Sequence, residues 1–245
     1  MKRLLTILLL LAPIASAAEF VIPAAPRSLY EKVAATHAHE TAVRFSWSPY
    51  ADHQAAAVVV KAGSSMGSGT FVQFDNERFV LTCKHVTAGS RDGTAEIRFQ
   101  DGRRVTGTCS YDKDGNDLAV VIIPPTTGVT VPVATVVTDA RVEVLGFGGP
   151  RDILRHWNIN RTNVSGGVAS YDGGVAAGDS GGGILDMSGA IVGVMTHGTT
   201  PSDTDNEDRW RTHAKSGGPY LTPIRSFLGR VADKIRTRQL CPPNG

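Results

Sequence analysis

The stretch Gly178-Asp179-Ser180-Gly181-Gly182 is the most informative part of this 245-residue chain. Small residues surround Ser180, so the backbone can turn tightly there and leave the hydroxyl uncovered. The amides of Gly178 and Ser180 can then point together at a substrate carbonyl oxygen and stabilise the negative charge that develops on it. Because a serine hydroxyl alone is a weak nucleophile, this interpretation requires a base and an orienting acid elsewhere in the chain.

Two upstream segments supply these partners. His85 lies in Leu81-Thr82-Cys83-Lys84-His85-Val86-Thr87-Ala88-Gly89, and Asp117 lies in Asn116-Asp117-Leu118-Ala119-Val120-Val121. The order along the chain is therefore histidine, aspartate, serine, which is the chymotrypsin-type order.

The five residues around Ser180 also match the Gly-x-Ser-x-Gly turn of α/β-hydrolases, in which the serine comes first and the histidine last. His197 and His213 follow Ser180, so counting histidines does not separate the two classes. The surrounding sequence separates them, because residues 57–200 are mostly short valine-rich runs broken by glycine and proline. An α/β-hydrolase needs long helical segments between its strands.

The chain resembles the trypsin/chymotrypsin-like serine peptidase superfamily and is most similar to its compact bacterial branch, which includes glutamyl endopeptidases and HtrA-type protease domains. The resemblance covers roughly residues 57–225. It rests on four blocks in the family's order: Gly67-Ser68-Gly69-Thr70-Phe71, the His85 segment, the Asp117 segment, and Gly178 to Gly182 followed by Ile191-Val192-Gly193-Val194.

The resemblance implies a role for each matched residue. His85 takes the proton of Ser180 during attack and later gives it to the leaving amine, while Asp117 accepts the other imidazole N–H. Gly178 and Ser180 supply the oxyanion hole. The hypothesis is a serine endopeptidase that works through an acyl-enzyme; the alternatives are an esterase with the same triad and a latent, non-catalytic peptide-binding module.

An all-β fold is expected from 27 glycines, 13 prolines and many short apolar runs. The resemblance implies two packed antiparallel β-barrels with a C-terminal helix. Helical spacing occurs only from Pro223 to Leu240, where five apolar residues share one face: Ile224, Phe227, Leu228, Val231 and Ile235.

The expected organisation has four parts. Residues 1–17 read as a secretory signal peptide, with Lys2 and Arg3 before an apolar run and Ala15-Ser16-Ala17 as the cleavage site. Residues 18–55 form an N-terminal arm or propeptide. Residues 56–225 form the peptidase domain, with barrels at about 56–130 and 131–225, and residues 226–245 form the helix and tail. The expected location is secreted or periplasmic.

The net charge and the expected reaction indicate which classes of binding partner to expect. Removing Lys2 and Arg3 lowers the 25 Lys and Arg to 23, which equals the 23 Asp and Glu. Neither a nucleic-acid partner nor a membrane partner after cleavage is therefore indicated, and the expected partner is a polypeptide substrate. The chemistry needs no cofactor and no metal; His37-Ala38-His39 is only a weak exposed pair.

The three cysteines fit export but cannot all pair within one chain. Cys83 precedes His85 by two residues, and Cys109 lies on the strand leading to Asp117. Both fall in the first barrel implied by the resemblance, so we expect a Cys83–Cys109 disulfide. Cys241 would be free or form an intermolecular bridge.

Substrate preference is the least readable property. By the resemblance, Gly174 lines the base of the specificity pocket, and Thr196, His197 and Gly198 form a wall that pairs with the substrate as an added strand. Thr196 is expected to hydrogen-bond Asp117. Gly198 and Gly218 leave the pocket open, which favours an apolar or aromatic residue over an acidic one, although His197 leaves the acidic preference open.

Two segments leave questions open. Residues 199–215 form a charged insertion, interpreted as a solvated loop rather than a selector of basic substrates. Asp179 holds the position that pairs with a new N-terminus in trypsin-like zymogens, but no basic cleavage site followed by Ile-Val-Gly-Gly is present. Asp179 would then pair with an internal cation or with an N-terminus made by another cut.

Overall fold

The computed structural model describes residues 51–136, 140–148, 154–173, 175–199 and 215–237, all within one compact unit spanning residues 46–245. The expected signal peptide, most of the N-terminal arm, Gly174, Cys241 and most of the charged insertion lie outside the described residues. Among the residues that the structure describes, no helix is both long enough and apolar enough to cross a bilayer.

The first sheet closes into a six-stranded barrel. The strand order is β1-β4-β5-β6-β3-β2, and β1 pairs again with β2 to close the ring. All of these pairs are antiparallel, and β7 adds to β2 in parallel. The strands are β1 (Ala57–Ala62), β2 (Ser65–Phe74), β3 (Glu77–Thr82), β4 (Thr94–Arg98), β5 (Arg104–Tyr111), β6 (Ala119–Ile122) and β7 (Val131–Pro132).

The second sheet has seven antiparallel strands in the order β12-β11-β8-β9-β10-β14-β13. An isolated bridge between Gly193 and Tyr220 brings β12 next to the end of β14, so the sheet curls toward a barrel. The strands are β8 (Arg141–Gly146), β9 (Arg155–Ser165), β10 (Val168–Asp172), β11 (Gly183–Leu185), β12 (Ile191–Val194), β13 (His197–Thr199) and β14 (Lys215–Pro219). The expected pair of antiparallel β-barrels is thus confirmed as the fold class.

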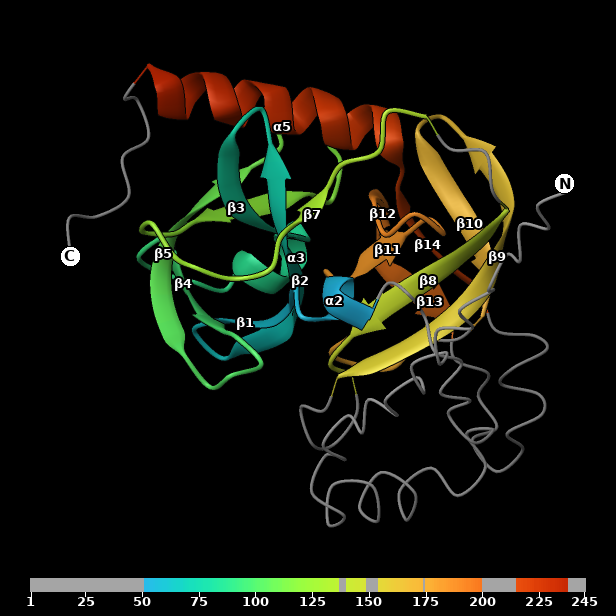
Figure 1. Ribbon diagram of the computed structural model, residues 1–245, viewed down its shortest axis with the longest axis horizontal. Coiled ribbons are helices and arrows are strands. Elements are labelled where there is room, and N and C mark those ends of the chain that lie inside the picture. The colour runs from blue at the N-terminus through green and yellow to red at the C-terminus, as the bar shows by residue number, and fades with distance from the viewer. Residues whose placement is uncertain (1–50, 137–139, 149–153, 174, 200–214, 238–245) are drawn as a thin grey trace, which may run out of the picture. The chain divides into compact units, whose positions relative to one another are not determined.

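One apolar core runs across both sheets. Buried residues from the strands of the first barrel make up most of this core, and the same cluster includes Leu145, Leu185 and Val194 from the second sheet. A smaller cluster around Tyr171 fills the second sheet itself. The two sheets therefore pack on each other through buried side chains, and Figure 1 shows them side by side.

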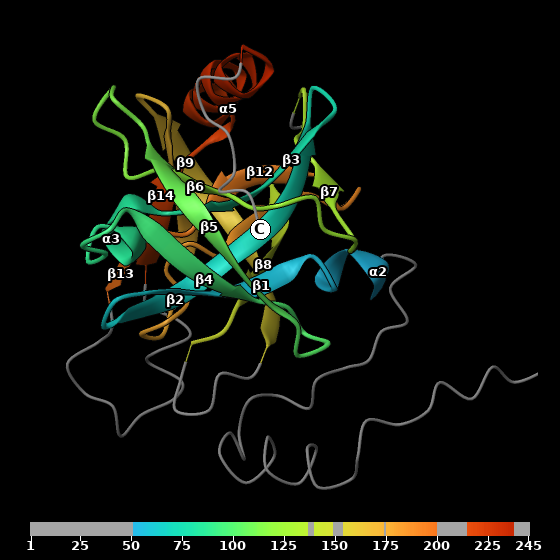
Figure 2. The same ribbon diagram turned by 90° about the vertical axis from the view of Figure 1, so that its left-hand side faces the viewer.

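The C-terminal helix α5 (Leu221–Arg236) covers one side of both sheets (Figures 1 and 2). Ile224, Phe227, Leu228 and Val231 are buried in the main core, and Ile235 packs against it, which confirms the expected apolar face. On the same helix, Arg230 Nη2 lies 2.5 Å from the buried carboxylate of Asp112 in the first barrel. An ion pair therefore holds the helix on the barrel in addition to the apolar contacts.

A buried polar cluster connects the short helix α2 (Ala51–Gln54) to the second sheet. His53 Nε2 lies 2.6 Å from Glu143 Oε2 on β8, and Gln54 Nε2 donates to Glu143 Oε1 over 3.0 Å. His156 Nδ1 on β9 lies 3.2 Å from the same Oε1. Two histidines and an amide thus surround one carboxylate whose side chain is 14% exposed.

The expected Cys83–Cys109 disulfide is wrong, because both thiols are free. The sheet order explains this: β6 lies between β3, which leads into Cys83, and β5, which carries Cys109. Strands on either side of a third are roughly 10 Å apart, whereas a disulfide needs Cα atoms within about 7 Å. Cys83 and Cys109 lie near the His85 and Asp117 segments in the sequence, but their strands are not neighbours in the sheet.

Candidate active site

His85 and Asp117 are held together by the first barrel. His85 lies on the one-turn helix α3 (Lys84–Thr87) that follows β3, and Asp117 ends the turn before β6. β3 and β6 pair with Thr82 opposite Ala119, which places the ends of the two segments side by side. His85 Nδ1 lies 2.6 Å from Asp117 Oδ2, and the His85 amide donates to Oδ1 over 2.9 Å.

This double contact fixes both the ring and its tautomer. With Nδ1–H donating to the carboxylate, Nε2 is left without a proton and can act as a base. The two side chains are 48% and 35% exposed, so the pair faces solvent where a substrate could reach it. The arrangement fits the roles of base and orienting acid expected for these residues.

Cys83 lies directly beside this pair, with Sγ 3.6 Å from His85 Nε2. The thiol is fully buried, and burial, together with the nearby Asp117 charge, raises its pKa to about 12. Cys83, His85 and Asp117 place one ligand-type atom each within 4.8 Å of one another. However, metals bind the thiolate, and this thiol is inaccessible and protonated at neutral pH. The cluster therefore fits a buried thiol packed against the base better than a metal site.

The nucleophile loop turns through two glycines in the left-handed region. Gly178 has φ +99° and Gly181 has φ +87°. A Cβ on Gly181 would lie 2.1 Å from Thr82 Oγ1 and 2.2 Å from Ser68 O, so only glycine fits. The loop thus packs tightly against the end of β3, which leads into α3.

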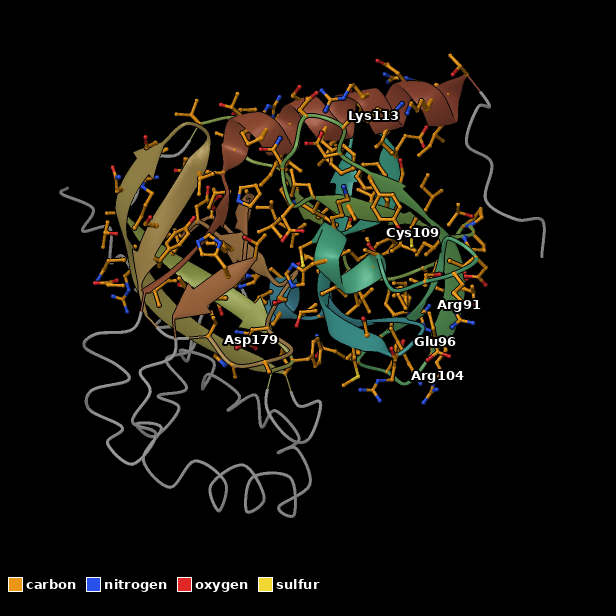
Figure 3. The ribbon with its side chains drawn as sticks, turned by 180° about the vertical axis from the view of Figure 1, so that it is seen from behind. Arg91, Glu96, Arg104, Cys109, Lys113 and Asp179 are labelled. Atoms are coloured by element: carbon orange, nitrogen blue, oxygen red, sulfur yellow. The ribbon has the colours of Figure 1, made fainter. Side chains whose placement is uncertain are left out.

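Asp179 anchors the loop to the second sheet. Its carboxylate is fully buried and accepts hydrogen bonds from the amides of Gly148 (2.6 Å) and Ala176 (2.8 Å). A Cβ on Gly146 or Gly148 would approach Asp179 Oδ1 to 2.4 Å, so the end of β8 closes around the carboxylate. Figure 3 shows Asp179 on the second sheet's side of the molecule, well away from Cys109. Asp179 holds the position whose carboxylate pairs with the new N-terminus in trypsin-like zymogens; here two backbone amides contribute to holding it.

Ser180 is half-buried and lies beside the helix that carries His85. A Cβ placed on Gly67 would contact both Val86 of α3 (2.5 Å) and Ser180 O (2.7 Å), so the loop and the helix meet across this glycine. Among the described residues, no hydrogen bond joins Ser180 Oγ to His85, and the amides of Gly178 and Ser180 donate to no protein atom. Catalytic contacts of this kind are often long without substrate.

The expected substrate-binding residues lie at the edge of the second sheet. Among the strands that the structure describes, β13 is the last in its sheet, and His197 and Gly198 on it are exposed, so this edge can pair with an extended peptide. Gly218 is instead buried in β14, where a Cβ would lie 1.8 Å from Val194 O. Its lack of a side chain therefore serves packing.

The expected Thr196–Asp117 hydrogen bond is not formed. Thr196 Oγ1 lies 3.0 Å from His197 Nδ1 and donates to Gly217 O over 3.3 Å. The Thr196 amide donates to the same Gly217 carbonyl over 3.0 Å, so both donors of this residue face β14.

Sequence reasoning overlooked the role of Ser68, which belongs to the quoted Gly-Ser-Gly block. Its hydroxyl donates to Gly178 O over 2.6 Å and accepts from the Phe147 amide over 2.8 Å. A serine flanked by two glycines in a strand was a signal that a backbone approaches closely there, but it did not reveal which backbone.

Residues 67–194 match the model of the family described as "Trypsin-like peptidase domain". No curated protein has a sequence that matches this chain. Among solved structures, the serine protease of human pathogenic astrovirus is 16% identical, with TM-score 0.54, covering 70% of this chain and 93% of that one. The inactive form of the Rv3671c protease is 20% identical, with TM-score 0.56, covering 75% and 93%. An inactive mutant of Rv3671c from M. tuberculosis gives the same TM-score and identity, covering 76% and 91%. These structures share the fold of the chain.

Proposed function

Because this chain belongs to the trypsin-like peptidase family and is a serine peptidase, we propose that it is an endopeptidase whose nucleophile is Ser180, activated by His85 and oriented through Asp117. The observation that carries this assignment is the 2.6 Å contact between His85 Nδ1 and Asp117 Oδ2. It leaves His85 Nε2, which lies 3.6 Å from Cys83 Sγ, as the ring nitrogen that can accept a proton.

The reaction proceeds in two halves. Ser180 Oγ attacks the peptide carbonyl carbon while its proton passes to His85 Nε2, and the carbonyl oxygen becomes an oxyanion held by the amides of Gly178 and Ser180. The intermediate collapses, the C–N bond breaks, and the amine leaves with the proton from His85. Water then attacks the acyl-enzyme carbonyl and gives a proton to His85 Nε2. The bond between the acyl carbon and Ser180 Oγ breaks, His85 returns the proton to Ser180 Oγ, and the product leaves as the new carboxylic acid, which ionises in water.

The substrate lies along β13, and its main chain pairs with the exposed edge at His197 and Gly198. The residue expected at the base of the specificity pocket is Gly174, which has no charged side chain. We therefore propose that the enzyme prefers an apolar or aromatic substrate residue before the cleaved bond. The leader expected at residues 1–17 supports secretion or export to the periplasm.

The test is labelling of the purified protein with a fluorophosphonate, followed by intact mass. The wild type should gain one phosphonyl group per chain, and Ser180→Ala should gain none. Ser188→Ala is the matched control, because Ser188 is an exposed serine on the turn after β11 that only bonds Asp186, and it should label like the wild type.

Each alternative has its own outcome. A labelled enzyme that turns over p-nitrophenyl acetate but no peptide would be an esterase. A folded wild type that resists the probe would be the latent peptide-binding module. Labelling that persists in Ser180→Ala would place the nucleophile elsewhere and contradict the proposal.

A further inference from the structure

We propose that Ser68, on β2 of the first barrel, is a positioning residue for the oxyanion hole. It acts through the nucleophile loop and does not touch the substrate. This inference rests on the proposed function, because it concerns the same two amides, those of Gly178 and Ser180.

Ser68 connects the two halves of the molecule at one point. It is fully buried, and each of its polar atoms has a partner. Its amide donates to Ser180 O (2.8 Å), and its hydroxyl donates to Gly178 O (2.6 Å). The same hydroxyl accepts from the Phe147 amide (2.8 Å), and the Ser68 carbonyl accepts from Thr82 Oγ1 (2.7 Å). The Ser180 loop, the end of β8 and β3 therefore meet at one residue, and the Ser68 hydroxyl itself joins the first two.

These bonds determine how the loop presents its amides. The peptide between residues 178 and 179 is held at both ends, its oxygen by Ser68 Oγ and its N–H by Ala176 O (3.0 Å). The peptide between residues 180 and 181 is also held at both ends, its oxygen by the Ser68 amide and its N–H by Met195 O (2.7 Å). The peptide between these two carries the Ser180 N–H, which is one donor of the hole.

Gly178 cannot hold this orientation by itself. Its φ of +99° lies in a region where glycine is permissive, so rotation about its bonds is opposed mainly by hydrogen-bond partners. The Phe147 and Gly148 amides are consecutive, and they bond Ser68 Oγ and Asp179 Oδ1 respectively. Ser68 and Asp179 therefore fix the loop from opposite sides against the same turn at the end of β8.

The experiment compares Ser68→Ala with the wild type in the rate of fluorophosphonate labelling and in hydrolysis of p-nitrophenyl acetate. Loss of a whole oxyanion donor costs roughly 100- to 1,000-fold in kcat. Ser68→Ala only loosens the donors, so we expect kcat and the labelling rate to fall about 10- to 100-fold with KM nearly unchanged. Final labelling should still reach one group per chain, since the fold and the nucleophile are kept.

The pH profile separates positioning from general disorder. Ser68 has no contact with His85, so the plateau should fall while the midpoint that reports the base stays in place. Ser68→Cys nearly preserves the volume with a weaker donor, and it should lie between Ala and the wild type. Recovery of full activity by Cys would mean that packing alone matters and would overturn the proposal.

Thr70→Val is the matched control. Thr70 lies on the same strand two residues on, is equally buried, and its hydroxyl has no hydrogen-bond partner in the described part of the chain. It should label at the wild-type rate. A Ser68→Ala rate within threefold of this control would overturn the inference, as would a raised KM at unchanged kcat. Turnover that persists in Ser180→Ala would instead remove the proposed function, and the inference with it.

Discussion

The cluster around Glu143 predicts a measurable pH dependence of stability. Burial raises the pKa of this carboxyl, but hydrogen bonds from His156 and His53, with the charges of these histidines, outweigh burial and lower it from 4.5 to about 2. At about 1.36 kcal/mol per pH unit, the difference between 4.5 and about 2 corresponds to about 3 kcal/mol of folding free energy. Because the folded-state pKa is the lower one, this contribution is present above about pH 4.5 and is lost as the pH falls toward about 2.

The assay is urea unfolding of the wild type and Glu143→Gln between pH 2 and 6. The glutamine variant cannot ionise, so its free energy of unfolding should lie about 3 kcal/mol below that of the wild type at pH 5.5 and approach it near pH 2. Glu96→Gln is the control, because it breaks only the exposed ion pair with Arg104 (Figure 3). Its effect should stay below about 1 kcal/mol at every pH.

Two results would refute this reasoning. A difference between the wild type and Glu143→Gln that is the same at pH 2.5 and pH 5.5 would mean that ionisation of the carboxyl is not linked to folding. A difference at pH 5.5 no larger than that of the Glu96 control would mean that the histidines do not stabilise the charge.

Three further changes test other parts of the structure. Asp117→Asn should lower kcat by about 10⁴-fold, because the base then takes the wrong tautomer, while the urea midpoint barely moves; a loss below tenfold would contradict the assigned role. Gly181→Ala should destabilise by about 3 kcal/mol, since φ is +87° and the new Cβ would lie 2.1 Å from a hydroxyl of β3. Gly102→Ala is the control, because Gly102 has the same φ but open space around it, and it should cost only about 1 kcal/mol; thermal melts of both variants measure the difference. Arg230→Ala should lower the free energy of unfolding in urea by about 2 kcal/mol, because it removes a charged partner from buried Asp112. An unchanged urea midpoint would mean that this ion pair makes no net contribution to stability.

Local patterns predicted the fold class and the terminal helix well. The glycines around Ser180 demanded a tight turn, and the apolar spacing from Ile224 to Val231 specified which helix face is buried. These features depend on neighbours within a few residues, which a single sequence displays directly.

Features that depend on the order of strands were not predictable. The Cys83–Cys109 pairing failed because a third strand lies between the two segments. The contact of His53 with Glu143 joins residues 90 positions apart, and no motif marks either one. Ser68 belongs to one of the family blocks, yet its hydroxyl bonds Gly178, which lies 110 positions further along the chain.

The position of α5 has a consequence for biosynthesis. Ile224 and Phe227 belong to the same hydrophobic core as Ala56, so contacts between nearly opposite ends of the described chain are needed to complete this core. Such long-range contacts form late and slowly. A ribosome that has translated the Ser180 loop but not α5 therefore still holds a chain whose core is incomplete. We expect proteolytic activity to appear only after α5 has emerged and docked, so that the active protease follows the translation of Ser180 with a delay.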